Sequence, residues 1–448
     1  MAEPVPLDDP GANPPAPDTA PVDTAPVDTA PLDTAPLDTA PLDADGRGRW
    51  SLSAAEAAAR LGIKRQTLYA YVSRGLIERR VDSDGRSSRF DPVEIERFRF
   101  GRHDDDAGEL RTLLSTRLTR VADTGLIVRG RDLVGFVAGG ARFADVVDLL
   151  WDAPADEAWP SWSSVDTELA ALTLPGLAGR VAGSPLDELR LIVTLASARD
   201  PLRTDLAPRS VRALGRRLIM AMASGLGAAP GPAGTGSTEG SVAGRLWGRL
   251  ATVEASPERV AAVDTALSLL IDHGLAASTF AARIAASVRA DPYSVLLTAL
   301  GVIDGPLHGG SSATVHRMLE DAARSGDPAR AVGAARRQLG HFPGIGHRIY
   351  RHHDPRYATL LGRLMEAWAG DPRLGLVLQV RDLIGQRSGD LANVDAALGA
   401  LTFLGGMPAD AGGVLFSVGR AAGWLAHGAE EYGEAPLRFR ARERYTGL

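Results

Sequence analysis

The chain has 448 residues, enough for two or three domains and a large core, and 45% of them are hydrophobic but only 5% aromatic. It contains no cysteine, which excludes disulfide bonds, thiolate nucleophiles and Cys-ligated metals. The formal net charge of −6 gives no reason to expect nucleic-acid binding along the whole chain. No stretch reaches the roughly 20 apolar residues of a membrane span, and the N-terminus lacks a signal-peptide pattern, so we expect a cytoplasmic protein without membrane contact.

Residues 1–48 predict a disordered acidic tail. A five-residue unit, PVDTA and later PLDTA, repeats within residues 17–45. Proline at every fifth position opposes helix formation, and the sparsely apolar unit buries too little surface to offset its ordering entropy. A solvated spacer is favoured over a segment that binds a specific partner.

Residues 49–103 predict a small basic domain. Ser53 and Glu56 have the spacing of a capping box, which starts an Ala-rich helix that the sequence LGI ends. A second helix is expected from about Lys64 to Ser73. The following RRVDSDGRSSRF indicates a hairpin with its tip at SDG, and DPVEIERF opens another helix.

The stretch AAARLGIKRQTLYAYVSRGLI within this domain resembles the winged helix-turn-helix of MerR-type regulators and excisionases. The domain also has an excess of positive charge, which contacts with DNA phosphates require. The candidate DNA-binding residues are Lys64, Arg65, Arg74 and Arg86. Lys64 stands where a small hydroxyl residue commonly caps the second helix, which weakens that cap. The alternative is a module that has become a dimerisation or docking domain.

From about residue 104 onward the pattern predicts a region built only of helices. FADVVDLLW, SVAGRLWGRLATV and PERVAAVDTALSLLIDHGLAASTFAARIAASV all show apolar residues at i, i+3 and i+4. Glycine or proline interrupts each segment. No alternating pattern of useful length indicates a strand.

Five ordered blocks in this region resemble citrate synthases and their 2-methylcitrate synthase relatives. The blocks are IDHGLAASTFAARIAASVRADPYSVLLTALGVIDGPLHGGSSATVHRM, FPGIGHRIYRHHDPRY, NVDAALGALTFLGGMP, GRAAGWLAHGAEE and RFRARERYTGL. The resemblance covers residues 110–448 and implies an all-α, two-domain fold. We expect a large domain of residues 104–308 and 401–448 and a small domain of residues 309–400, preceded by the winged module and the tail.

The resemblance also implies roles for particular residues. His308 corresponds to the histidine that hydrogen-bonds the thioester carbonyl, Asp395 to the base that removes the α-proton, and His347 to the histidine that assists attack on the ketone of oxaloacetate. The keto-acid carboxylates are assigned to His273, Arg356, Arg420 and Arg440, with Arg440 reaching the site of the neighbouring subunit. Coenzyme A is assigned to the loop residues Pro343, Gly344, Ile345, Gly346 and Arg348.

These residue types suit the implied chemistry. A thioester α-carbon is weakly acidic, so enolisation needs a base for the proton and a hydrogen-bond donor for the developing enolate oxygen. Arginine forks bind carboxylates through two hydrogen bonds, as a dicarboxylate substrate requires. A metal site is the rival interpretation of His347, His352 and His353, but no zincin-type spacing accompanies them, and we expect no metal.

The leading interpretation is therefore a citrate synthase-type acyltransferase that condenses an acyl-CoA with oxaloacetate. It would need no cofactor beyond the coenzyme A thioester, which is a substrate, and it would work as a homodimer or higher even oligomer. Gly274, Ala276 and Ala396 depart from the family pattern, and the C-terminal RARERY lacks the usual proline. These departures permit a bulkier acyl-CoA such as propionyl-CoA. The alternative is a DNA-binding transcription regulator whose synthase-like domain senses acyl-CoA or a keto acid.

Overall fold

The computed structural model describes residues 52–61, 63–73, 77–81, 87–92, 95, 114–122, 125–172, 184–227, 240–305, 308, 310–347, 349–350, 352–388 and 392–440. The tail expected over residues 1–48 lies outside these ranges. The chain divides between Leu113 and Leu114 into two compact units, which are described separately.

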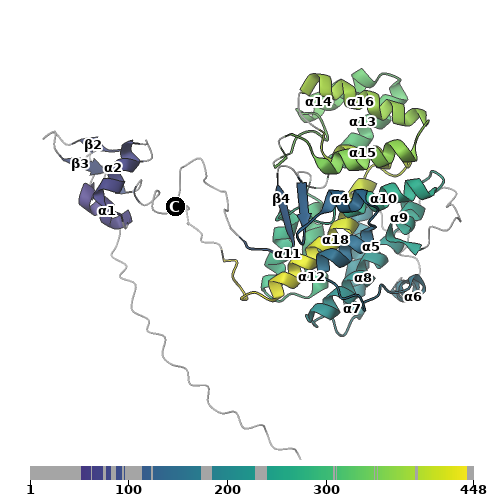
Figure 1. The fold of residues 1–448 in the computed structure, drawn as a ribbon, viewed down its shortest axis with the longest axis horizontal. Coiled ribbons are helices and arrows are strands. Elements are labelled where there is room, and N and C mark those ends of the chain that lie inside the picture. Colours follow the sequence, from purple (N-terminus) through teal and green to yellow (C-terminus); the bar gives the residue numbers. More distant parts are fainter. Residues whose placement is uncertain are drawn as a thin grey trace, which may run out of the picture. The chain divides into compact units, whose positions relative to one another are not determined.

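The N-terminal unit contains the two predicted helices and the predicted hairpin (Figure 1). Its elements are β1 (Leu52–Ser53), α1 (Ala54–Leu61), α2 (Arg65–Ser73), β2 (Arg80–Val81) and β3 (Ser88–Phe90). The capping box at the start of α1 is confirmed, because the Ser53 amide donates to Glu56 Oε2 at 2.8 Å and the Glu56 amide donates to Ser53 Oγ at 3.3 Å. Strand β1 was not predicted, and it pairs antiparallel with β3 to give the sheet order β1-β3-β2.

A small apolar core holds this unit together. Leu68 of α2, Phe90 of β3 and Ile95 are fully buried, together with Ile77, and Leu61 packs against them. The Ile95 amide donates to the Asp91 carbonyl at 2.9 Å, as in the first turn of a helix. The hairpin tip and most of the predicted third helix lie outside the described residues.

The second unit begins with a three-stranded antiparallel sheet that the sequence did not predict. Its strands are β4 (Thr119–Ala122), β5 (Gly125–Val128) and β6 (Arg131–Asp132), in the order β4-β5-β6, with Thr119 opposite Val128. In β5 only Leu126 and Val128 are fully buried. Two buried residues in a four-residue strand are too few to produce a recognisable alternating pattern.

The rest of the described second unit is mainly helical, which confirms the predicted fold class. The helices are α4 (Leu133–Ala138), α5 (Phe143–Trp151), α6 (Trp162–Leu172), α7 (Pro185–Arg199), α8 (Pro208–Ser224), α9 (Val242–Leu250), α10 (Pro257–Leu269), α11 (Ala277–Ser287), α12 (Pro292–Ile303), α13 (Ser311–Ser325), α14 (Pro328–Leu339), α15 (Pro355–Ala367), α16 (Pro372–Ser388), α17 (Val394–Leu404) and α18 (Ala411–Tyr432). None of the described helices is long and apolar enough to cross a membrane.

Many of these helices begin at a Ser-Pro or Asp-Pro pair. The proline takes the first helical position, where no backbone N–H is needed, and the preceding side chain caps the helix. Ser256 accepts from the Arg259 amide before α10, Asp291 from the Ser294 amide before α12, and Asp354 from the Arg356 amide before α15. These caps fix the loops that precede the helices, and the loop before α15 carries site residues.

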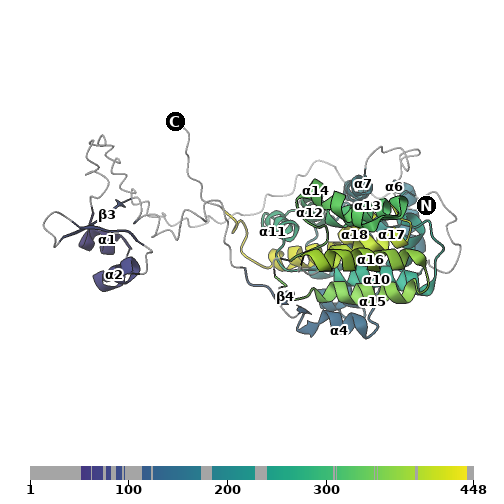
Figure 2. The same cartoon turned by 90° about the horizontal axis from the view of Figure 1, so that it is seen from above.

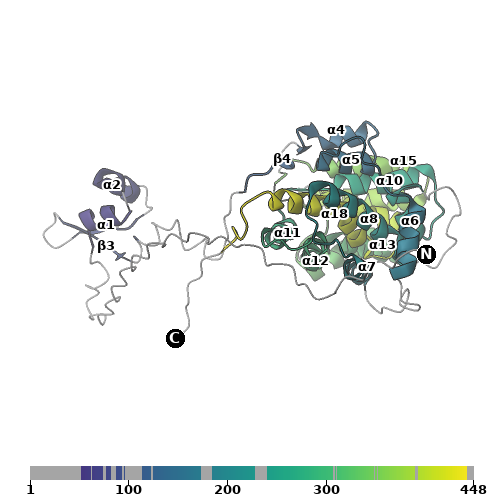
Figure 3. The same ribbon diagram turned by 90° about the horizontal axis from the view of Figure 1, so that it is seen from below.

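Two groups of helices make up the second unit. Helices α13, α14, α15 and α16 gather at one end (Figure 1), and Figure 2 shows this group from above. Helix α13 packs against α14, α16 and α17, and α15 packs against α10 and α17. In the other group α18 packs against α8, α10, α11 and α12, and Figure 3 shows it between α8 and α11. Helix α17 packs against both α13 and α18, so it joins the two groups.

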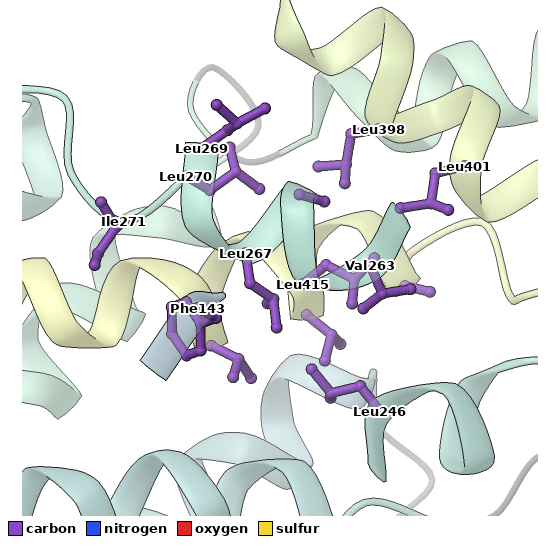
Figure 4. Packing of buried hydrophobic residues seen from close by; sticks show 14 of the residues in the cluster. Phe143, Leu246, Val263, Leu267, Leu269, Leu270, Ile271, Leu398, Leu401 and Leu415 are labelled. Carbon is purple, nitrogen blue, oxygen red and sulfur yellow. The ribbon is translucent and has the colours of Figure 1, made fainter. Parts of the chain in front are cut away.

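Helix α10 lies in the main hydrophobic core. Val263 and Leu267 of α10 and the C-cap residue Leu270 are fully buried. Figure 4 shows Leu267 near Phe143 of α5 and Leu415 of α18. Full burial of each such side chain stabilises the fold by roughly 1.5 to 3 kcal/mol. The end of α10 is thereby held rigidly, which fixes the backbone that continues into Asp272 and His273.

Candidate active site

The loop after α10 and the loop after α14 bring three aromatic side chains together. His273 Nε2 lies 3.1 Å from the Tyr350 hydroxyl, and the rings of His273 and His347 meet edge to face with centroids 5.1 Å apart. Burial, followed by the charges of Arg356 and Arg420, lowers the pKa of His273 to about 2. His273 is therefore a neutral hydrogen-bonding group at physiological pH.

Backbone hydrogen bonds fix the tautomer of the His347 ring. Its Nδ1 accepts hydrogen bonds from the backbone amides of Ile349 and Tyr350, both at 3.0 Å. Burial and the charge of Arg356 lower its pKa, so the ring is neutral and its single proton resides on Nε2. The Nε2 atom lies 3.5 Å from an Arg356 guanidinium nitrogen, so His347 can donate to an oxygen placed beside Arg356.

Arg356 is held by a carboxylate that also organises the surrounding backbone. Its Nε and one terminal nitrogen bind Asp354 at 3.0 and 2.8 Å, and both side chains are about 3% exposed. Asp354 Oδ2 also accepts from the Val394 amide at 3.0 Å, which ties the start of α15 to the start of α17. The pair is fully desolvated and well hydrogen-bonded, as a buried ion pair must be.

Arg420 is a buried cation on α18 without an ion-pair partner among the described residues. Its side chain is 1% exposed, and its Nε donates to the Leu270 carbonyl at 2.6 Å. Burial lowers its pKa to about 10, although the nearby Asp272 carboxylate opposes this shift. An unpaired buried charge is costly, so this guanidinium is suited to an anionic ligand.

Asp395 lies in the first turn of α17 and is positioned by the helix cap. Asn393 caps the helix, accepting from the Asp395 amide at 3.0 Å. Burial raises the pKa of the Asp395 carboxyl to about 6, and the Arg356 charge only partly offsets this. No described residue donates a hydrogen bond to its side chain, so the carboxylate is free to take a proton.

His308 is oriented by a serine and a tryptophan. Its Nε2 lies 2.9 Å from Ser278 Oγ, which also accepts from Trp424 Nε1 at 3.2 Å. Burial lowers the pKa of His308, with a further contribution from Arg420. Because Ser278 already accepts from Trp424, its own hydroxyl proton can go to His308 Nε2. The neutral ring then carries its proton on Nδ1, where it can serve as a donor.

The predicted coenzyme A loop is attached to the start of α17. Gly344 and Gly346 have positive φ angles of 70° and 82°, and the Gly344 carbonyl accepts from the Asn393 amide at 2.9 Å. The Asn393 side chain donates to the Gly346 carbonyl at 2.8 Å. A Cβ atom on Gly344 would lie 2.9 Å from the Cβ of Ala396, so this close approach requires glycine.

In the structure His273, His347 and Arg356 lie against one another, and Arg420 is close enough for its charge to act on His273, His308 and Asp395. Arg440 is not part of this group within this chain: it is exposed, next to Phe439, whose ring packs on Phe280 of α11 at 5.5 Å. Pro343 and Ile345 flank Gly344 in the loop. Arg348 lies outside the described residues, as do Arg74 and Arg86. Lys64 and Arg65 are exposed at the start of α2.

Four positioning residues were missed by sequence reasoning: Ser278, Tyr350, Asp354 and Asn393. Two of them had a local signal, because Asp354 precedes a proline and Asn393 precedes an apolar helical run, as helix caps do. Ser278 and Tyr350 act across the fold and had none. In the part of the chain that the structure describes, no group of three or more His, Cys, Asp or Glu side chains is arranged to hold a metal ion.

Comparison with known proteins adds an independent finding. Residues 111–442 match the model of the citrate synthase C-terminal domain, and residues 51–99 match that of a helix-turn-helix domain. The citrate synthase of Haloferax volcanii is 41% identical over 189 residues, which are 41% of this chain and 49% of that relative. The 2-methylcitrate synthase 2 of Corynebacterium glutamicum is 29% identical over 333 residues, which are 68% of this chain and 84% of that relative.

A solved structure has the same fold. The citrate synthase of Thermoplasma acidophilum, in a ternary complex with carboxymethyl coenzyme A and oxaloacetate, has a TM-score of 0.59 at 22% identity. The similarity covers 77% of this chain and 97% of that chain. The match spans about half the length of two curated relatives. It covers 49% of the Haloferax volcanii citrate synthase and 53% of citrate synthase 2 from Bacillus subtilis.

Proposed function

We propose that this chain, which belongs to the citrate synthase family, condenses an acyl-CoA with oxaloacetate to give citrate or an alkylcitrate and free coenzyme A. The observation that carries the proposal is the convergence of a free carboxylate, three neutral histidines and two buried arginines in one site. The family relatives include both citrate and 2-methylcitrate synthases, and both acetyl-CoA and propionyl-CoA are therefore candidate substrates.

Oxaloacetate is bound first in this proposal. The unpaired Arg420 guanidinium binds one carboxylate, and Arg356 binds the other beside His273. His347 then donates its Nε2 proton to the ketone oxygen, because its Nδ1 is fully occupied by two backbone amides. This hydrogen bond polarises the ketone and strengthens as negative charge develops on its oxygen.

The acyl-CoA is activated at the opposite side of the site. Asp395 removes a proton from the α-carbon while His308 donates a hydrogen bond from Nδ1 to the thioester oxygen, so the enolate is stabilised as it forms. The α-carbon forms a bond to the ketone carbon, whose oxygen becomes the hydroxyl of the product. Water then cleaves the thioester and releases coenzyme A. Closure of the small domain over the large one would exclude bulk water until the carbon–carbon bond has formed.

The direct test is release of free coenzyme A from acetyl-CoA or propionyl-CoA with and without oxaloacetate. Since the chain has no cysteine, a thiol reagent reports only coenzyme A. We expect thiol release that depends on oxaloacetate or a close keto acid. Absence of release above buffer with these two thioesters and with longer acyl-CoA thioesters would refute the condensing function.

We also propose that two copies of the chain share the site. The segment after α18 runs along α11, where the Leu437 amide donates to the Ser287 carbonyl at 2.9 Å. Ile284 of α11 and Val288, which directly follows the helix, are 42% and 55% exposed, and Leu437 is 70% exposed. These apolar side chains suit an interface between copies, and Arg440, which follows them, would reach the site of the partner subunit.

A second candidate function rests on the N-terminal unit. The helix-turn-helix match and the exposed Lys64 and Arg65 at the start of α2 favour DNA binding, with the synthase unit sensing acyl-CoA or keto acid. Retention of the full chain on DNA should then fall steeply with salt, because released counterions drive binding. Lys64→Glu with Arg65→Glu should abolish it, whereas Arg330→Glu with Arg337→Glu on α14 should not. Salt-insensitive binding, or none, would support a docking module instead.

A further inference from the structure

An apolar cavity of about 480 Å³ lies among α13, α15, α16 and α17. Its walls include the aliphatic side chains of Val315, Leu361, Val377 and Ile384, and the small side chain of Ala400. Ligand pockets in proteins span roughly 300 to 1,000 Å³, whereas tightly packed interiors leave few voids larger than a water molecule. The cavity is open to solvent on the side of α16 and is large enough for a bound group.

The cavity borders the proposed active site. Ala396, which directly follows Asp395, forms part of its wall, and so do Pro343 and Ile345 of the proposed coenzyme A loop. Ile345 pairs with Ala392 in an isolated β-bridge, which places the loop against the start of α17. Asp395 itself does not line the cavity, so an alkyl chain attached to the carbon beside Asp395 would enter it past Ala396.

Small side chains on α17 leave the space open. Ala396 and Ala400 are one turn apart on the same face of the helix, and both line the cavity together with Ala397. Among the polar lining residues, Arg381, Asp382 and Gln386 are exposed residues of α16, and Arg381 pairs with Asp382 at 2.7 Å. The remaining one is Tyr357, a half-buried and uncharged residue of α15. A polar ligand would find no unpaired charge deeper in the cavity, whereas an alkyl chain would be desolvated favourably.

We propose that this cavity holds the alkyl chain of the acyl-CoA, and that the preferred substrates are thioesters several carbons longer than acetyl-CoA. The inference rests on the proposed function, since it assigns the acyl chain of that same reaction. Each additional methylene buried in the cavity should tighten binding about fourfold, so hexanoyl-CoA, with four more methylenes, should bind roughly 250-fold more tightly than acetyl-CoA.

The test uses the full chain with acetyl-, propionyl-, butanoyl-, hexanoyl- and octanoyl-CoA, measuring both oxaloacetate-dependent coenzyme A release and calorimetric binding of each thioester and of coenzyme A. We expect kcat/KM and affinity to rise beyond propionyl-CoA. Ala400→Leu fills the cavity and should remove this gain for hexanoyl-CoA while sparing acetyl-CoA. Ala323→Leu, the same change on the exposed face of α13, should leave the chain-length profile unchanged.

A second variant guards against misfolding of the first. Val377→Ala enlarges the cavity and should shift the optimum toward octanoyl-CoA, and thermal unfolding reports whether each variant is folded.

If acetyl- and propionyl-CoA react but affinity falls with every further carbon, the cavity assignment is wrong and the condensing function stands. If no thioester reacts but hexanoyl-CoA binds more tightly than acetyl-CoA and Ala400→Leu cancels the difference, the assignment stands and the condensing function falls. Equal weakening of coenzyme A and hexanoyl-CoA by Ala400→Leu would place another part of coenzyme A in the cavity and refute the proposal.

Discussion

At the level of single residues, the half-buried Asp395 and the buried Arg420 are opposite charges in one site, and among the described residues neither has an ion-pair partner. The sequence located both, because NVD and GRAAGW stand in ordered blocks with a family resemblance. It could not locate Ser278 or Tyr350, because each acts on a residue from another element: Ser278 on His308 and Tyr350 on His273. A contact between distant elements leaves no local pattern in the chain.

Removing the charge of Asp395 should lower turnover, whereas removing the charge of Arg420 should lower the affinity for oxaloacetate. Asp395→Asn keeps the shape of the side chain but removes the base, so turnover should fall by about 10² to 10⁴-fold with oxaloacetate binding retained. Arg420→Leu should weaken oxaloacetate binding first, because one substrate carboxylate loses its partner. Calorimetry with oxaloacetate and a coenzyme A release assay separate the two. Loss of oxaloacetate binding in Asp395→Asn together with its survival in Arg420→Leu would show that the roles are assigned wrongly.

The raised pKa of Asp395 predicts the pH dependence of the reaction. A general base works only when deprotonated, so kcat/KM for the acyl-CoA should fall about tenfold per pH unit below the pKa of about 6 and level off above it. Oxaloacetate binding should stay nearly constant from about pH 5 to about pH 8, because Arg420, with a pKa of about 10, remains charged. A rate that rises as the pH falls below 6 would exclude Asp395 as the base.

At the level of elements, the helices could be predicted and the small sheet could not. The predicted segment FADVVDLLW corresponds to α5 residue for residue. Its apolar residues lie on one face of the helix and are buried in the core, and Asp152 ends the helix in a left-handed backbone conformation. Strands β4 to β6 have at most four residues and pair only with one another, so too few side chains alternate to give a signal. Position 400, the expected end of the small domain, falls inside α17, where the apolar run continues without a break.

The contact between the Gly344 loop and α17 should be essential for coenzyme A binding. Gly344→Ala places a Cβ 2.9 Å from Ala396 and Val315 atoms and strains a backbone with a φ of 70°. Gly340→Ala is the matched control, because its φ is 78° but no atom lies within 4 Å of the added Cβ. Both variants should lose about 1 to 2 kcal/mol of stability from backbone strain, but only Gly344→Ala should weaken coenzyme A binding strongly. Equal affinities in calorimetry would show that the loop does not hold coenzyme A.

At the level of the whole molecule, the proposed role of Arg440 makes each site depend on two subunits. If Arg440 acts in the partner's site, Arg440→Leu and Asp395→Asn should each be inactive alone. After unfolding and refolding together, half of the dimers would be mixed, and one site in each would have both residues, so about a quarter of the wild-type activity should return. Mixing that restores nothing while mixed dimers form would show that Arg440 does not act in the partner's site.

The central claim is that this site forms a carbon–carbon bond through an enolate made at Asp395. It is tested most directly by mass spectrometry of the product from oxaloacetate and acetyl-CoA whose methyl group carries three deuterons. The account predicts a tricarboxylate that retains two deuterons, because Asp395 removes one before the bond forms. Acetate that retains all three deuterons, with oxaloacetate unchanged, would mean that the site only hydrolyses the thioester and would contradict the account.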